Sequence, residues 1–390
     1  MSWRMVKLDC VKANVPYAFV GGPFGSNLTT RDYIEEGVPV IRGNNLPAGT
    51  YFHDDEFVFV SEKKADDLRA NTAFPGDVIF TQRGTLGQVG LVPWEARFSR
   101  YIISQSQMKL TVDSKTADPR FIYYFFRMPS TAQKVINHAL TSGVPHINLG
   151  ILKDFEIALP DVGVQHRIAD ILSAYDDLIE NNRRRMALLE DGARQLYREW
   201  FVRLRFPGHE HTRITNGVPY GWERTTFENA LVLQRGFDLP IQAREEGDVP
   251  IYGSTGINGF HNKSRVVGPC VVTGRSGTLG EVHYIGGDFW PLNTALWVKE
   301  FKRVTPLFSL FLMREMDLRQ YNGGVSVPTL DRKTVHRVKI LVPAKNLLLA
   351  FDDFATPLFD QMGTLMLQTQ KLRAARDLLL PALMSGKIAV

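Results

Sequence analysis

Two stretches of the sequence place an arginine between an apolar run and a glycine-flanked turn. Residues 78–81 lead into Gln82, Arg83 and Gly-Thr-Leu-Gly at 84–87, and residues 270–273 lead into Arg275, Ser276 and the same turn at 277–280. Arginine at the end of a strand can hold a phosphate or pair with guanine. We expect the glycines to serve as turn residues with positive φ. Arg83 and Arg275 look like counterparts of each other. For both, a structural role and a role in binding stay equally open.

Other polar residues in predicted loops are of the types that contact base edges or phosphates in DNA. In the first half of the chain the candidate DNA-binding residues are Ser26, Asn27, Arg42, Asn44, Asn45, Gln82, Arg83, Ser104, Gln105, His146 and Asn148. In the second half they are Arg235, Tyr252, Ser254, Thr255, Lys263, Arg275, Ser276, Asn293 and Thr329. We expect His146 to be a loop histidine and not a metal ligand, because no second ligand residue lies nearby at a suitable spacing.

The sequence motifs that would indicate catalysis are incomplete, absent or not evident. Residues 256–264 resemble a phosphate-binding loop, but Asn262 stands where glycine must precede Lys263. The sequence holds neither Gly-x-Gly-x-x-Gly nor Gly-x-Ser-x-Gly, and no methyltransferase tetrapeptide of the Asn-Pro-Pro-Tyr type. The carboxylate–lysine pattern of restriction nucleases is not evident either, although that pattern is too loose to exclude. We therefore expect a non-catalytic chain without a cofactor or a metal.

The elements that position these residues are duplicated along the chain. Val-Pro-His-Ile-Asn at 144–148 corresponds to Val-Pro-Thr-Leu-Asp at 327–331, and each is followed by a β-type run that ends at Pro160 or Pro343. Strands are predicted at 38–42, 56–60 and 77–81, and a single helix at 119–134. The duplication predicts two similar globules of mixed helix and strand.

Each globule is followed by a long amphipathic stretch. In 161–205 a series with a 4-3 spacing is apolar except for Asn182, and its members are Ile168, Leu172, Tyr175, Ile179, Asn182, Met186, Leu189, Ala193, Leu196 and Trp200. A weaker series follows Leu347, at Phe351, Phe354, Leu358, Gln361, Leu365, Gln368, Leu372, Ala375 and Leu379, and Pro381 is expected to end that helix. Such series predict an antiparallel intramolecular coiled coil, with two ordinary core helices as the alternative.

The domain organisation follows from this alternation. We expect an α+β protein with a first globule at 1–160, a spacer helix at 161–205, a second globule at 206–343 and a second spacer helix at 344–390, in a pseudo-two-fold arrangement. Apolar helix surface near Tyr197 and Phe201 is expected to be exposed and available to partners.

Composition limits the class of protein. The chain has 390 residues, a net charge of +5 and two cysteines. Cys10 and Cys270 have no partner spacing, so we expect two buried thiols and no disulfide framework. No apolar run is long enough for a membrane span, which predicts a cytoplasmic protein. A basic chain with two globules at a fixed separation favours a bipartite DNA sequence as its target.

The order and duplication of several short stretches resemble the specificity subunits of type I restriction–modification systems. These stretches are Gly-Pro-Phe-Gly-Ser at 22–26, Val-Pro-Val-Ile-Arg-Gly-Asn at 38–44, the two Gly-Thr-Leu-Gly turns, Ser-Gly-Val-Pro-His-Ile-Asn at 142–148, Glu-Asn-Asn-Arg-Arg-Arg at 180–185 and Pro-Tyr-Gly-Trp-Glu at 219–223. The resemblance covers essentially the whole chain. It implies two target-recognition domains that bind double-stranded DNA. It also implies two methyltransferase (modification) subunits as partners, to which motor-nuclease subunits add.

Two other classes stay open at this point. One is a freestanding enzyme with its site between two similar lobes, and the other is a rod-like adaptor that binds proteins only. Salt-dependent binding to duplex DNA, strengthened by methyltransferase subunits, would distinguish a specificity subunit from both.

Overall fold

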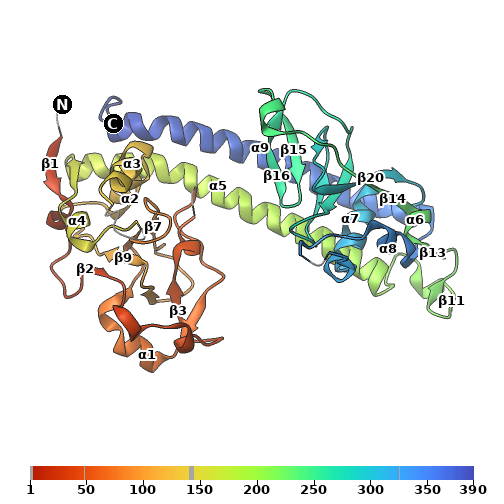
Figure 1. Ribbon diagram of the computed structural model, residues 1–390, viewed down its shortest axis with the longest axis horizontal. Coiled ribbons are helices and arrows are strands. Elements are labelled where there is room, and N and C mark those ends of the chain that lie inside the picture. Colours follow the sequence, from red (N-terminus) through yellow and green to blue (C-terminus); the bar gives the residue numbers. More distant parts are fainter. Residues whose placement is uncertain (1–2, 48, 140–144, 325) are drawn as a thin grey trace. The chain divides into compact units, whose positions relative to one another are not determined.

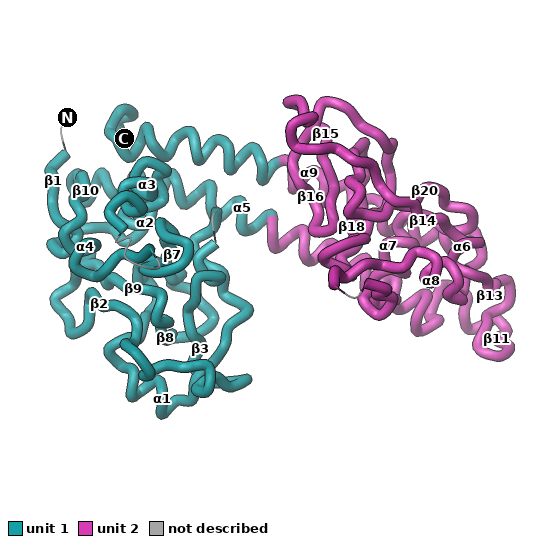
Figure 2. The backbone as a smooth tube through the Cα atoms, in the orientation of Figure 1, with its two compact units in different colours: residues 1–182, 368–390 teal, residues 183–367 magenta. Residues whose placement is uncertain are grey.

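The computed structural model describes residues 3–47, 49–139, 145–324 and 326–390. The chain forms two compact units (Figure 2). Unit 1 comprises residues 1–182 and 368–390, and unit 2 comprises residues 183–367. Each unit therefore contains one globule together with a segment of both long helices.

Unit 1 is built on two four-stranded sheets (Figure 1). The first has the order β2 (Phe19–Gly21), β9 (Gln107–Leu110), β6 (Val78–Thr81) and β7 (Val89–Leu91), and all its pairs are antiparallel. The second has the order β4 (Val58–Val60), β3 (Val38–Ile41), β8 (Tyr101–Ile103) and β5 (Thr72–Ala73), and in it β3 runs parallel to β8. A separate pair joins β1 (Arg4–Lys7) to β10 (Glu156–Leu159). The three strands predicted in this half are confirmed.

Four helices accompany these sheets: α1 (Glu62–Asp67), α2 (Pro119–Arg127), α3 (Pro129–Asn137) and α4 (Leu149–Lys153). The prediction of one helix over 119–134 is wrong, because the helix is interrupted at Met128, between α2 and α3. Its ψ of 132° is that of extended backbone, which the ring of the following proline favours over the helical conformation. Helix α2 is buried almost along its whole length against strands β6 and β7.

Unit 2 repeats the strand order of unit 1. Its main sheet has the order β14 (Leu231–Arg235), β20 (Ala295–Phe301), β17 (Cys270–Gly274) and β18 (Val282–Ile285). A second sheet consists of β16 (Gly256–His261), β15 (Val249–Gly253) and β19 (Trp290–Pro291), and β15 runs parallel to β19 as β3 does to β8. The predicted duplication is thus confirmed in the order and direction of the strands.

The remaining elements of unit 2 complete the repeat. The pair β13 (Glu223–Thr226) and β21 (Lys339–Val342) corresponds to β1 and β10, and a short hairpin joins β11 (Ile214–Thr215) to β12 (Val218–Pro219). The helices are α6 (Phe227–Ala230), α7 (Pro306–Glu315) and α8 (Arg332–Arg337). Helix α7 packs on β17 and β18 as α2 packs on β6 and β7.

The two long helices are α5 (Val162–Tyr197), which continues into a π-helical turn at Arg198–Val202, and α9 (Lys345–Met384). Every residue of the first predicted series, from Ile168 to Trp200, is buried or half-buried. The second series is confirmed in part. Its members Phe354, Gln361 and Gln368 are exposed, whereas the others are buried or half-buried: Phe351, Leu358, Leu365, Leu372, Ala375 and Leu379. The inward-facing positions of α9 are Phe351, Ala355, Phe359, Met362, Leu365, Thr369, Leu372, Arg376, Leu380 and Leu383.

Pro381 does not end α9, which is a further correction. The helix continues to Met384, and the side chains of Leu383 and Met384 are each only 2% exposed in the core of unit 1. Proline removes one hydrogen bond within the helix. Burial of two large apolar side chains beyond it offsets that loss.

Within unit 1 the two long helices pack side by side and antiparallel. Arg167 of α5 donates to the Val390 carbonyl (3.1 Å), and further along α5 the carboxylate of Asp176 pairs with Arg376 of α9. The Arg376 and Asp176 side chains are each only 2% exposed. Tyr124 of α2 donates to Asp176 (2.7 Å), and Arg376 also donates to the Gly49 carbonyl (2.9 Å). This buried network attaches both helices to the globule of unit 1.

Within unit 2 the same helices meet through aromatic rings. Trp200 lies 6.2 Å from Phe351 and 5.9 Å from Phe354, measured between ring centroids. Tyr197 and Phe201 are 3% and 8% exposed, so the expectation that they form an open apolar surface is wrong. Both side chains pack against Phe308 of α7 and belong to the core of unit 2.

Two other expectations concern cysteines and membranes. Cys270 is buried as expected, but Cys10 is exposed in a 3₁₀ turn, so that half of the prediction is wrong. Among the helices that the structure describes, none combines the length and the apolar character needed to cross a bilayer.

Candidate nucleic-acid interface

Several strands of unit 1 end at one common rim. The Ser104 N–H, just after β8, donates to the Ile41 carbonyl of β3 (2.9 Å), and the Gln82 N–H, just after β6, donates to the Ser106 carbonyl (2.8 Å). Gly22, just after β2, lies so close that an added Cβ would be 2.0 Å from the Ser104 carbonyl oxygen. Only glycine fits there. We call residues 22–27, 42–45, 82–87, 104–106 and 146 the unit 1 rim.

Side-chain hydrogen bonds hold the loops of the unit 1 rim together. Gln82 donates through Nε2 to the Gln105 carbonyl (3.0 Å), and Gln105 donates through Nε2 to the carbonyls of Gly25 (2.6 Å) and Leu28 (2.7 Å). The backbone of Arg83 pairs with that of His146 in an antiparallel bridge. The rim therefore brings together Ser26, Asn27, Arg42, Asn44, Gln82, Arg83, Ser104, Gln105 and His146 from segments far apart in the sequence.

The corresponding rim of unit 2 comprises residues 235–238, 252–255, 275–280, 292–294 and 329. The Leu292 N–H donates to the Tyr252 carbonyl (2.8 Å) and the Arg275 N–H donates to the Thr294 carbonyl (2.8 Å). A Cβ added to Gly236 would lie 2.2 Å from the Leu292 carbonyl oxygen. Gly236 thus approaches Leu292 as closely as Gly22 approaches Ser104 in unit 1. The unit 2 rim brings together Arg235, Ser254, Thr255, Arg275, Ser276, Asn293 and Thr329.

Equivalent hydrogen bonds fix which residues correspond between the two rims. The Ile147 N–H donates to the Gln82 carbonyl (3.1 Å), and the Leu330 N–H donates to the Arg275 carbonyl (2.8 Å). The bridge of Arg83 with His146 has its counterpart in a bridge of Ser276 with Thr329. Gln82 is therefore the counterpart of Arg275, and Arg83 is the counterpart of Ser276. The pairing of Arg83 with Arg275 suggested by the sequence is wrong by one position.

The side chains at the Gln82 and Arg275 position are also anchored alike. Arg275 donates through Nη1 to the Asn293 carbonyl (3.1 Å), and Asn293 is the counterpart of Gln105, whose carbonyl accepts from Gln82. Burial, and secondly the nearby guanidinium of Arg235, lower the pKa of Arg275. An arginine nevertheless stays protonated in a protein. Unit 2 thus presents two cationic groups at its rim.

The Gly-Thr-Leu-Gly segments are turns, as expected. Gly84 and Gly277 both have φ of 91°, and Gly87 and Gly280 have φ of 83° and 94°. These values lie in the left-handed region that favours glycine. The turns carry the chain away from each rim immediately after the candidate contact residues.

Four of the candidate residues are buried, cap a helix or lie away from the rims. Asn45 is fully buried and bonds to Arg42, His53 and Asp55, and Tyr252 is 8% exposed beside the Phe289 ring. Asn148 caps α4 by accepting from the Ile151 N–H (2.8 Å). Lys263 follows β16 at the opposite end of the β15–β16 hairpin from Ser254. Of the motif at 142–148, residues 142–144 lie outside the described residues.

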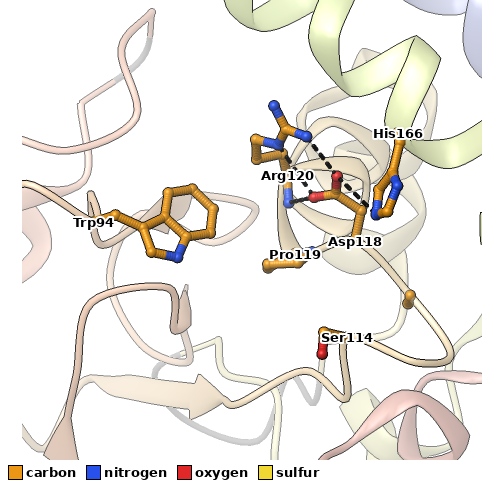
Figure 3. A pocket seen from close by; sticks show the side chains of 7 residues that line it. Trp94, Ser114, Asp118, Pro119, Arg120 and His166 are labelled. Carbon is orange, nitrogen blue, oxygen red and sulfur yellow. Dashed lines mark hydrogen bonds and ion pairs between the residues drawn. The ribbon is translucent and has the colours of Figure 1, made fainter.

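A pocket of about 330 Å³ lies in unit 1 away from the rim (Figure 3). The Trp94 ring forms one side, and Asp118 and His166 lie on the other. Trp94 packs near Gly76, before β6 begins, whereas Gln82 follows the end of that strand. The pocket therefore lies at the other end of β6 from the candidate contact residues.

The pocket also holds Ser114, so its polar residues include the three types of a hydrolytic triad. However, His166 Nε2 is 3.8 Å from the Asp118 carboxylate, which is beyond hydrogen-bonding distance. That carboxylate instead accepts from Arg120, through its backbone N–H (2.8 Å) and through Nη2 (2.8 Å). The geometry does not support nucleophilic catalysis here. Within the described ranges, no three His, Cys, Asp or Glu side chains are arranged to hold a metal ion.

Sequence reasoning missed the close approach of Gly22 and Gly236 and the true counterpart of Arg275. A gap-free alignment of residues 82–87 with 275–280 on their shared turn would have revealed that Gln82 is the counterpart of Arg275. The close approach of the glycines has no local signal in the sequence. In unit 1 it depends on contacts between segments about eighty residues apart, such as the hydrogen bond from Gln105 to Gly25.

Comparisons with known proteins agree with this architecture. Residues 27–191 match the family described as type I restriction modification DNA specificity domain. The MjaIX specificity subunit of Methanocaldococcus jannaschii is 21% identical over 361 residues, which cover 85% of this chain and 82% of the relative. The HindI specificity subunit of Haemophilus influenzae is 27% identical over 104 residues, covering 26% and 23% of the two chains.

A solved structure shares the whole fold. The S subunit of a type I restriction–modification system from M. genitalium aligns over 98% of this chain and 96% of its own, with a TM-score of 0.59 and 18% identity. Two globules that repeat one strand order, together with two long helices, define a duplicated α+β subunit. Over most of its length the chain is similar to a specificity subunit of a type I restriction–modification system.

Proposed function

We propose that this chain recognises a bipartite DNA sequence, with each unit binding one half of the target through its rim. The observation that carries this proposal is the equivalence of the two rims. They share the backbone frame around β6 and β17, yet differ in the side chains that the frame presents. A common frame with different polar side chains suits two readers of two different short sequences.

The chemistry of the rims supports DNA as the ligand. Their side chains are mainly Arg, Asn, Gln, Ser and Thr, the types that make hydrogen bonds to base edges and phosphates. Arg83 and Arg235 are exposed and cationic, which suits contact with phosphate. The net charge of +5 favours association with a polyanion.

We further propose that the chain is a non-catalytic subunit. In this proposal it works with two methyltransferase subunits, to which motor-nuclease subunits add. The division into globules at 1–160 and 206–343, with spacer helices at 161–205 and 344–390, is part of the same proposal. Helices α5 and α9 would set the number of unread base pairs between the half-sites and dock the methyltransferase subunits.

An exchange of one globule tests this function. The full chain would be produced with its methyltransferase subunits, and residues 1–160 would be replaced by the matching segment of a relative with another target. Mapping of methylated adenines should show one new half-site and one unchanged half-site. A change in both half-sites would contradict independent reading. Methyl transfer by the isolated chain would contradict the non-catalytic role.

A further inference from the structure

We infer that the position shared by Gln82 and Arg275 reads one base in each half-site, an adenine in the half bound by unit 1 and a guanine in the half bound by unit 2. This inference rests on the proposed function and specifies which residue meets which base at one equivalent position.

The side chains of Gln82 and Arg275 are attached at equivalent backbone positions of the two units. Each follows the last residue of its central strand, β6 or β17, and each accepts a backbone hydrogen bond from the strand-like segment that follows His146 or Thr329. Each is also half-buried and donates one hydrogen bond to the carbonyl of the counterpart residue, Gln105 or Asn293. Such anchoring restricts the rotamers of the side chain before DNA binds.

The free atoms of the two side chains match different bases. The Oε1 atom and the second Nε2 hydrogen of Gln82 carry no hydrogen bond to residues that the structure describes. An amide with one acceptor and one donor free can pair with N6 and N7 of adenine. Arg275 uses Nη1 for the Asn293 carbonyl, and its remaining N–H groups can donate to O6 and N7 of guanine.

The surroundings favour the same assignment. The charged neighbour that perturbs Arg275 is the guanidinium of Arg235, so this part of the unit 2 rim is doubly cationic. Two acceptors on one base edge, as guanine provides, suit a site of donors. Gln82, by contrast, is uncharged and has one acceptor and one donor free of bonds to the described residues, which suits the mixed donor and acceptor edge of adenine.

Arg83 and Ser276 are less suitable for this role. Among the described residues, no hydrogen bond anchors the side chain of Arg83 or Ser276, in contrast to those of Gln82 and Arg275. Arg83 and Ser276 are joined through their backbones to the segment containing His146 or Thr329. We therefore assign base reading to the first position of each pair.

The experiment selects binding sites from a randomised duplex library with the full chain bound to its methyltransferase subunits. It compares the wild type with Gln82→Arg, Arg275→Gln and Arg275→Lys. Lys115→Gln and Lys299→Gln serve as matched controls, because both lysines are exposed and lie away from the rims. Thermal melting of each complex shows whether a variant is folded.

Arg275→Gln should replace a guanine preference by an adenine preference at one position of one half-site, with roughly 10- to 100-fold weaker binding to the original site. Gln82→Arg should make the reverse change in the other half-site, and the controls should select the wild-type sequence. Should Arg275→Gln fail to fold, Arg275→Lys decides, because loss of the two-pronged contact should weaken the guanine preference.

Variants that select the wild-type bases with wild-type preference would overturn this assignment and leave the proposed function intact. A wild-type complex that selects no sequence at all would overturn the proposed function itself. The two failures are therefore distinguishable.

Discussion

The buried pair of Asp176 and Arg376 gives the sharpest test of how the long helices are attached to unit 1. The change is Arg376→Met, which keeps an unbranched apolar stem and removes the guanidinium. It leaves the Asp176 carboxylate, 2% exposed, without its closest cation, and leaves the Gly49 carbonyl without its donor. Tyr124 remains a donor to Asp176, because burial and the nearby carboxylate raise the pKa of its phenol.

The expected loss of stability follows from this geometry. Removal of one partner from a buried ion pair typically costs about 3–5 kcal/mol, since the remaining charge stays desolvated. Arg127 lies 3.5 Å from Asp176 and partly compensates, so we expect about 3 kcal/mol. Replacing both residues, as Asp176→Leu with Arg376→Met, should cost less than Arg376→Met alone. The charge then left over is Arg127, which is 14% exposed and still donates to the Tyr123 hydroxyl, whereas the lone Asp176 carboxylate is 2% exposed.

The assay is urea unfolding of the full chain, followed by a probe in unit 1 and a probe in unit 2, because the two units need not unfold together. Only the unit 1 transition should move to lower urea. Lys7→Met is the control, since Lys7 and its partner Asp154 are exposed, and it should leave the midpoint unchanged. A double variant less stable than Arg376→Met would refute the argument from desolvation.

Three further predictions concern pH, salt and spacing. Burial, and then Asp353, raise the pKa of Asp352 to about 6 against the opposing hydrogen bond from Thr305. The native state therefore holds this proton more tightly than the unfolded state. Unit 2 should accordingly lose stability as the pH rises from about 4 to about 6. Asp352→Asn should remove that loss and raise the unfolding free energy at pH 7 by about 1 kcal/mol, once solvent screening is allowed for; an unchanged pH profile in urea titrations would contradict it. Arg83→Ala should weaken binding to all sequences alike and reduce the slope of log K against log salt by about one, as measured by fluorescence anisotropy; a change of base preference would instead indicate base reading. Seven residues inserted in both α5 and α9 add about 10 Å of helix, so the spacer in the methylated site should grow by about three base pairs or binding should be lost, and activity on the original site would contradict a rigid spacer.

The sequence predicted α5 more accurately than α9 for a physical reason. In α5 the regular 4-3 series coincides with the buried face, although Leu178 and Leu188 are 50% and 72% exposed. In α9 apolar residues also lie outside, as Phe354 at 61% and Leu378 at 78% exposure show. The buried face of α9 also includes the polar Thr369 and Arg376. Hydrophobic spacing cannot reveal a buried arginine whose partner, Asp176, lies two hundred residues away.

The duplication of the globules could be predicted from the sequence repeat, but the composition of the rims could not. Residues 22–27 lie beside Gln105 because of hydrogen bonds across 77 to 80 residues of sequence. Asn45 has the same polar character as Asn44, yet it is fully buried while Asn44 is exposed. Which polar side chain points outward depends on loop conformation, for which short motifs carry little information.

The same geometry explains how specificity can vary while the fold stays constant. Several bonds of each rim join backbone N–H groups to backbone carbonyls, and these bonds place no demand on side-chain type. Gln82 and Arg275 differ in size and charge, yet each is held by one bond to an equivalent carbonyl. A residue at this position can therefore change without loss of the frame, provided that it still donates to that carbonyl. Positions that must stay small, such as Gly22 and Gly236, are those where the frame itself approaches within van der Waals contact.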